Sequence, residues 1–520
     1  MNKSNNISES YFTTNSHTMQ LRFNLNTEVY VKDNGKVLLV RNLLERMFLP
    51  ELSTLYPSKG RKLSVDPRTM LQLLLFCYSE GCFSSRDIED RCRYDLRLIY
   101  LLDGQKAPDH STIHRFRKKL APFFEGILEQ FTLLLYEHGF LDLSSLYIDG
   151  TKMEAVSNKY SFVWRGSIEK FQSKLVEKIR RELNLPEDAD LQETQKSLKK
   201  AFLECKRNCK KQKIVFVYGT GKRKSEEQRN YEKYEEWLEK LENYAHHLAM
   251  MGERNSYSKT DPDATFMRMK DDHMRNGQLK PAYNIQYAST GYFIVGSYAS
   301  HHPSDMYTLP LFVEKLHQKY GGWMDKIVAD AGYESEENYA FLEEKGLRSF
   351  IKPSNYEQSK TRKYKKQMEE RASLIYDEAG DYYTHPNGKR FVRATDRIRK
   401  KRSGYPSVSK VYCCWDWNEN GQKTKSFFFA EKFNEYRRKS LENICSEEGI
   451  EERINRSIQA EGVFSKLKSG LNYHRFPCKG LANIKAEIDL LALALNVNTL
   501  VSKIQRADFT PTRYGIKQAS

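Results

Sequence analysis

The chain has 520 residues, of which 39% are hydrophobic and 29% charged, with a formal net charge of +17 and a pI near 9.2. This length exceeds one simple core and predicts several domains. The excess of positive charge favours a polyanionic partner, with nucleic acid ranked ahead of an anionic membrane surface. Charge alone is also compatible with a basic protein that has no such partner.

The sequence shows no pattern of a secretory signal, a membrane-spanning segment or a disulfide framework. Residues 1–16 are polar and lack the apolar core of a secretory signal, and the apolar residues 490–495 are too few to span a bilayer. Nine cysteines without regular spacing do not form a disulfide framework. We therefore expect a cytoplasmic protein with no membrane partner.

The first 140 residues show helical patterns. Apolar residues recur three or four apart from Asp66 onward, and Asp109 is placed to begin a short basic helix over residues 113–119. This pattern predicts a helical N-terminal DNA-binding domain over residues 1–140, with an ordinary solvated basic face as the alternative. Its candidate contacts to DNA are Arg115, Arg117 and Lys118.

The remaining chain alternates strands and helices with two interruptions. Strand patterns over 141–149, 281–288, 292–300, 326–330 and 347–351, with helices between and after them, predict an α/β core of a mixed sheet flanked by helices. We assign this core to residues 141–155, 279–352 and 441–510. Residues 156–278 are predicted to form a long helical insertion, and residues 353–440 a second insertion that contains strands.

Three acidic residues stand out from this organisation. Asp149 and Asp330 each end a short apolar strand, and Glu461 lies in a predicted helix over residues 451–467. One aspartate after a strand is most often a turn residue. Two such aspartates and a helical glutamate, brought together by folding, would instead offer the hard oxygen ligands that Mg²⁺ prefers.

Three converging carboxylates suit chemistry at a phosphodiester. Two metal ions about 4 Å apart neutralise the attacking and leaving oxygens, and they need one shared carboxylate with one more on each side. We expect Asp149 to be shared, and Asp330 and Glu461 to hold one ion each. Nearby lysines are either phosphate contacts or solvated side chains; they are Lys152, Lys466 and Lys468.

These motifs resemble a known family. Tyr-Ile-Asp-Gly-Thr-Lys at 147–152, Val-Ala-Asp-Ala-Gly-Tyr at 328–333 and Ala-Glu-Gly-Val-Phe at 460–464 look like bacterial insertion-sequence transposases of the DDE type. The long insertion after the first aspartate, and Pro-Asp-His-Ser-Thr at 108–112, resemble insertion-sequence family eleven-eighty-two. The likeness spans roughly residues 60 to 505.

The resemblance implies an RNase H-like catalytic core, two Mg²⁺ or Mn²⁺ ions per active site and double-stranded DNA as partner, both element ends and target. It also implies a homodimer or higher assembly on DNA, and a bacterial, nucleoid-associated location. Related transposases often carry an arginine four residues before the glutamate. Here that position is Ser457, and Arg456 lies one residue away.

Three functions are compatible with this reading. The first is a transposase that binds terminal inverted repeats, acts as an endonuclease and transfers the cut strand in DNA recombination. The second is a catalytically inactive, transposase-derived DNA-binding protein. The third is a nuclease without strand transfer, which shares the same site. An intact acidic triad argues against the second, because fold stability does not require three acids to converge.

Overall fold

The computed structural model describes residues 35–55, 64–219, 221–269, 277–400, 404–415 and 425–511. The chain divides into two compact units, one of Met1–Phe131 with Leu493–Asp508, and one of Thr132–Ala492 with Phe509–Ser520. Residues 1–16, discussed above as lacking a secretory signal, lie outside the described ranges. Within those ranges, no helix combines the length and apolar character needed to cross a bilayer.

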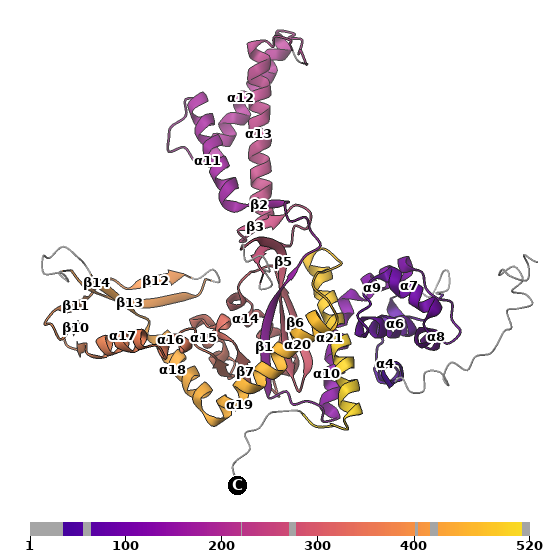
Figure 1. Ribbon diagram of the computed structural model, residues 1–520. Helices are drawn as coiled ribbons and strands as arrows, with labels where there is room; N and C mark the ends of the chain where they lie inside the picture. The colour runs from indigo at the N-terminus through magenta and orange to yellow at the C-terminus, as the bar shows by residue number, and fades with distance from the viewer. Residues whose placement is uncertain are drawn as a thin grey trace, which may run out of the picture. The chain divides into compact units, whose positions relative to one another are not determined.

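Helix α6 forms the centre of the first unit. It is buried along nearly its whole length and contacts α4, α8 and α9 (Figure 1). Asp66 caps it by accepting from the backbone N–H groups of Arg68 and Thr69, and Asp109 caps α9 through Thr112 at 2.7 Å. The helices are α4 (Gly35–Arg46), α5 (Glu51–Thr54), α6 (Pro67–Ser79), α7 (Ser85–Tyr94), α8 (Leu96–Leu102) and α9 (His110–Leu120).

A six-stranded mixed sheet forms the core of the second unit, as the sequence predicts. The strand order is β4-β5-β1-β7-β8, and β6 pairs with β5. Strand β1 pairs parallel with β7 and antiparallel with β5. The strands are β1 (Ser145–Glu154), β4 (Thr265–Arg268), β5 (Leu279–Thr290), β6 (Phe293–Ser300), β7 (Lys326–Ala329) and β8 (Arg348–Ile351). Strand β4 lies in the range assigned to the helical insertion, because its four residues are too few to show a period.

Helices that contact this sheet include α14 (Leu309–Tyr320), α15 (Glu336–Glu344), α18 (Glu431–Cys445) and α19 (Glu447–Arg456). Helices α10 (Phe124–Glu137) and α21 (Leu481–Gln505) each contain residues of both units. The predicted helix over 451–467 is not one regular α-helix. After α19 come the π-helical turn η5 (Ser457–Glu461), the short α20 (Gly462–Ser465) and a second π-helical turn, η6 (Lys466–Gly470). Such turns are rare and often occur at functional sites.

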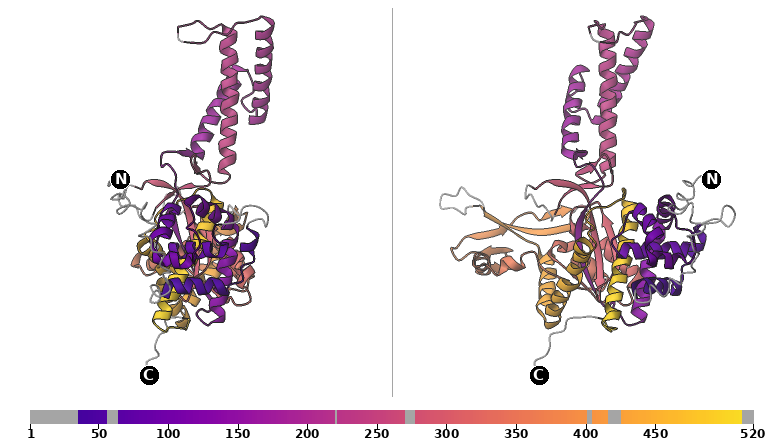
Figure 2. Two further views of the ribbon diagram at one scale, coloured as in Figure 1. Left: turned by 90° about the vertical axis from the view of Figure 1, so that its right-hand side faces the viewer. Right: turned by 45° about the vertical axis from the view of Figure 1, so that its right-hand side comes forward.

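The first insertion contains three long helices that run beside one another in every view (Figures 1 and 2). They are α11 (Arg165–Glu182), α12 (Leu191–Lys211) and α13 (Glu226–Met251). Leu175, Ile179, Leu198 and Leu241 form their shared apolar cluster. The short strands β2 (Phe162–Trp164) and β3 (Ser256–Ser258) pair where this insertion begins and ends.

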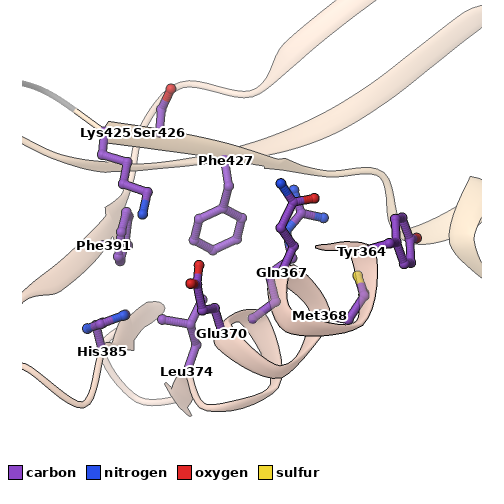
Figure 3. A pocket seen from close by; sticks show the side chains of 11 residues that line it. Tyr364, Gln367, Met368, Glu370, Leu374, His385, Phe391, Lys425, Ser426 and Phe427 are labelled. Atoms are coloured by element: carbon purple, nitrogen blue, oxygen red, sulfur yellow. The ribbon is translucent and has the colours of Figure 1, made fainter. Parts of the chain in front are cut away.

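The second insertion contains its own six-stranded antiparallel sheet, in the order β12-β13-β11-β10-β9, with β14 beside β13. Phe391, Tyr412 and Cys414 form its buried core. Helix α17 (Arg362–Ala372) and this sheet line a hollow of about 390 Å³, with Phe427 on the strand side and Glu370 on the helix side (Figure 3). The strands are β9 (Ile375–Asp377), β10 (Tyr382–Thr384), β11 (Arg390–Arg393), β12 (Arg397–Lys400), β13 (Pro406–Cys414) and β14 (Lys425–Phe429).

Candidate active site

Asp149 and Asp330 lie at matching positions on neighbouring strands. Strand β1 pairs in parallel with β7, and Ile148 stands opposite Ala329. The residue that follows each of these two is an aspartate. Paired strands lie about 4.8 Å apart, so the backbones of Asp149 and Asp330 are neighbours at the carboxyl end of β7, which we call the aspartate edge. Asp330 directly follows β7 as predicted, but the prediction that Asp149 ends its strand is wrong, because pairing with β5 continues β1 to Glu154. Asp149 is 8% exposed, and Asp330 accepts a hydrogen bond of 2.8 Å from the backbone N–H of Gly332.

Glu461 lies on the helical segment that crosses the same strands. Its turn, η5, contacts both β1 and β5. Ala460 packs against Tyr147 and Val328, each two residues before one of the aspartates. The ring of Phe464 stacks on Tyr287, which is the β5 partner of Asp149, with ring centroids 5.4 Å apart. The backbone of Glu461 is therefore fixed beside the aspartate edge.

The side chain of Glu461 forms an ion pair with Arg456. The distance from the guanidinium to the carboxylate is 3.1 Å, and the glutamate side chain is 56% exposed. The two residues are five apart, which in a regular α-helix would place them on different faces. The π-helical turn between them has an i to i+5 repeat and brings them together. Arg456 lies one residue before the position at which related transposases often carry an arginine, and the π-helical turn still brings its guanidinium to Glu461.

The buried hydroxyl of Tyr333 links these charges electrostatically. Burial raises the pKa of Tyr333 well above its ordinary value, and the carboxylates of Asp305, Asp149 and Asp330 raise this pKa further. The guanidinium of Arg456 acts in the opposite direction. One fully buried phenol therefore feels both aspartates, the arginine that holds Glu461, and a fourth acid that the sequence analysis did not single out.

The donor set fits a hard divalent cation only in part. Asp149 and Asp330 supply adjacent oxygen ligands of the kind that Mg²⁺ and Mn²⁺ take. Across the residues that the structure describes, however, no three His, Cys, Asp or Glu side chains lie close enough to hold one ion. The carboxylate of Glu461 is instead engaged by Arg456.

Three polar residues that the sequence analysis missed surround the aspartate edge. Asn284 and Gln286 are fully buried on β5, and both donate to the same oxygen of Asp305, at 2.7 and 2.8 Å. The hydroxyl of Tyr333 donates to the amide oxygen of Gln286. Asp305 lies five residues beyond the end of strand β6, where a strand-end pattern does not reach, whereas Asp330 follows β7 directly and Asp149 lies within β1.

The DNA-contact candidates of α9 differ in how free they are. Arg115 and Lys118 are exposed. Arg117 is half-buried and donates to the hydroxyl of Tyr78 at 2.7 Å and to the carbonyl of Phe83 at 3.4 Å. Arg117 thus stabilises the helical unit through the same guanidinium that would contact a phosphate.

The three lysines near the acids also occupy different environments. Lys152 is half-buried on β1, and strand alternation places it on the opposite face from Asp149. Lys466 is exposed, with its ammonium 5.5 Å from the ring centre of Tyr292. Lys468 is half-buried on η6. Of these, Lys466 is the most accessible to a phosphate.

Comparison with protein families gave two matches. Residues 25–119 match a model described as Transposase domain (DUF772), and residues 254–497 match one described as Transposase DDE domain. The second range contains Asp330 and Glu461 and begins beyond the three long helices, whereas Asp149 lies outside both ranges. Searches of curated proteins and of solved structures gave no significant match.

Proposed function

The chain belongs to the DDE transposases of insertion sequences, and from this premise we propose that it binds the terminal inverted repeats of its element, cuts a DNA strand there and transfers that strand to target DNA. We assign the chemistry to Asp149, Asp330 and Glu461. The finer family type named above stays a prediction.

One observation carries the assignment of these residues. The parallel pairing of β1 with β7 brings Asp149 level with Asp330, and the helical segment with Glu461 packs across the same strands. A divalent cation bound between two neighbouring carboxylates lowers their mutual repulsion, and here Asp149 is buried and Asp330 half-buried. The neighbouring positions of these two aspartates, close to the buried polar residues Asn284 and Gln286, support a metal-binding role for both.

The protein's own part in the reaction is to bind and orient. Asp149, Asp330 and Glu461 would hold the divalent ions, which when bound neutralise charge on the oxygens of the reacting phosphodiester. The backbone N–H of Gly332 fixes one oxygen of Asp330 and so limits its rotation. Packing of Ala460 and Phe464 fixes the backbone on either side of Glu461.

Arg456 would have two alternative partners. In the structure its guanidinium donates to one oxygen of Glu461, and a DNA phosphate offers it oxygen acceptors of the same charge. Transfer of Arg456 to a phosphate would release Glu461 toward the aspartates. Lys466 and the exposed residues of α9, Arg115 and Lys118, would add sequence-independent contacts to the DNA backbone.

Cleavage of labelled element-end DNA in Mg²⁺ tests this proposal. The parent chain is expected to release a strand with a free 3′-OH and to join it to a second duplex, whereas Asp149→Ala, Asp330→Ala and Glu461→Ala are not. Equal cutting by all three variants would overturn the site assignment. Specific DNA binding by a parent chain that cuts under no condition would favour an inactive, transposase-derived binder. Cutting without joining would indicate a nuclease.

A further inference from the structure

A single buried amide connects the two aspartate-bearing segments. Gln286 is fully buried on β5, directly opposite Gly150 on β1. Its amide nitrogen donates to Asn284 at 2.9 Å and to Asp305 at 2.8 Å, and its amide oxygen accepts from Tyr333. Every polar atom of this side chain is therefore used, and its orientation is fixed from three directions.

Gly150, the residue after Asp149, makes room for this amide. A β-carbon at position 150 would overlap the amide nitrogen of Gln286 and would lie 2.7 Å from its oxygen. Position 150 lies within the extended strand β1, so space rather than an unusual backbone angle explains the glycine. The Gln286 amide thus lies directly against the backbone that carries Asp149.

The other end of the connection reaches Asp330. Asp330 caps the short helix η4 (Ala331–Tyr333). Within this helix the backbone N–H of Gly332 donates to the Asp330 carboxylate, and the hydroxyl of Tyr333 donates to Gln286. The second oxygen of Asp305 lies close to the same turn, 3.5 Å from where a β-carbon of Gly332 would be. Movement of Gln286 would therefore displace the turn that orients Asp330.

We propose that Gln286 is a positioning residue of the strand-transfer reaction, which sets the separation of Asp149 and Asp330 by joining Gly150, Tyr333 and Asp305. This inference rests on the proposed function. In this role Gln286 acts through the backbone beside one aspartate and the turn beside the other. Outer residues that orient metal ligands contribute about 10- to 100-fold to metal affinity.

A double-mutant cycle separates this role from ordinary packing. Gln286→Ala removes the amide, Gly150→Ala displaces it, and in the double variant the new methyl group at position 150 occupies space that the glutamine side chain vacated. The control is Gly296→Ala on β6, whose new β-carbon would lie 2.5 Å from a methyl of Leu316, on a strand that bears none of the three acids. It introduces a comparable clash without touching Gln286.

Each variant is read in two ways. Mn²⁺ affinity is measured by electron paramagnetic resonance on the protein alone, and by the Mn²⁺ concentration that half-saturates cleavage of element-end DNA. Thermal unfolding without metal reports the fold. Each single variant is expected to weaken Mn²⁺ affinity about 10- to 100-fold, and the double variant no more than Gln286→Ala alone. Gly296→Ala is expected to lower the melting temperature and leave Mn²⁺ affinity unchanged.

Two results would overturn the positioning role. One is unchanged Mn²⁺ affinity in folded Gln286→Ala and Gly150→Ala. The other is a loss of affinity that follows the melting temperature equally in all variants, Gly296→Ala included, because that pattern indicates packing alone. Failure of the proposed function looks different, since Asp149→Asn and Asp330→Asn would then bind Mn²⁺ as the parent does.

Discussion

The two six-stranded sheets of the second unit bury different chemistry. The sheet of β1 and β4–β8 encloses Asn284, Gln286 and Asp149 next to its apolar residues. The sheet of β9–β14 has a core of Phe391, Tyr412 and Cys414. Burying polar groups is unfavourable unless each is paired, whereas burying aromatic rings stabilises directly. The mixed sheet therefore buries polar groups that need partners, whereas the β9–β14 sheet gains stability from an aromatic core.

Strand direction explains why Asp149 and Asp330 lie side by side in the mixed sheet. Strand β1 runs parallel to β7 and continues past its end, so Asp149 within β1 lies beside Asp330, the residue that follows β7. In the β9–β14 sheet the described pairings are antiparallel, and successive strands end on opposite sides. Asp149 and Asp330 are adjacent because of the parallel pairing, and not because of their separation in sequence.

The largest expected effect on activity comes from removing one charge at the aspartate edge. Asp149→Asn or Asp330→Asn should lower the rate of strand cleavage by about 1000-fold or more, because charge neutralisation at the reacting phosphate is lost. Gel assays on labelled end DNA measure this rate. The matched control is Asp381→Asn in the second sheet, where Asp381 accepts from Tyr412 at 2.8 Å. A comparable loss in that control would contradict the contrast between the sheets.

The next effect concerns the aromatic core. Phe391→Ala should destabilise the β9–β14 sheet by about 3–4 kcal/mol, because a buried ring is replaced by a cavity. Hydrogen–deuterium exchange of the amides in β10, β11 and β13 would detect the loss locally. The affinity of the aspartate edge for Mn²⁺ should not change. A parallel drop in Mn²⁺ affinity would mean that the two sheets act as one unit.

A buried ion pair that anchors α18 gives the third prediction. Glu334 is 2% exposed in its side chain and accepts from Arg437 at 2.7 and 3.0 Å. Burial alone would raise the pKa of Glu334, but the bonds from Arg437 and Ser354 outweigh it and lower the pKa. Glu334→Ala should cost about 3 kcal/mol in urea unfolding, since it leaves Arg437 without its partner.

The control for that variant is the exposed pair of Glu343 and Lys439, 2.8 Å apart. Glu343→Ala should change the free energy of unfolding by less than about 1 kcal/mol. Equal costs for the two variants would show that burial of Glu334 adds nothing to the strength of its pair.

The smallest effect is a pH dependence at the end of the mixed sheet. Hydrogen bonds from Arg348 and Lys326, opposed by burial, lower the pKa of Glu448 from 4.5 to about 2. Because this pKa is lower in the folded state, the stabilisation is complete above pH 4.5 and is lost as the pH falls toward 2. Glu448→Gln should flatten the unfolding free energy over that window. An unchanged slope would indicate that these ion pairs contribute nothing.

Both aspartates could be singled out because each follows an apolar run and has a glycine within two residues after it. Asp330 does follow β7, but Asp149 does not end its strand, because pairing with β5 continues β1 to Glu154. The element order of the mixed sheet followed from similar local patterns. The two π-helical turns could not be predicted, since Ser457–Glu461 has no local signal that separates it from an α-helix. Gln286 was missed because its partners Asp305 and Tyr333 are 19 and 47 residues away and only folding brings them together.

The central claim is that Asp149, Asp330 and Glu461 share divalent cations, and a crystal structure of the chain soaked in Mn²⁺ with element-end DNA tests it most directly. Anomalous difference density should lie between the two aspartates, with the Glu461 carboxylate turned toward it and Arg456 released to a phosphate. Density confined to other parts of the chain, with Glu461 still bound to Arg456 and no ion beside Asp149 and Asp330, would contradict the account.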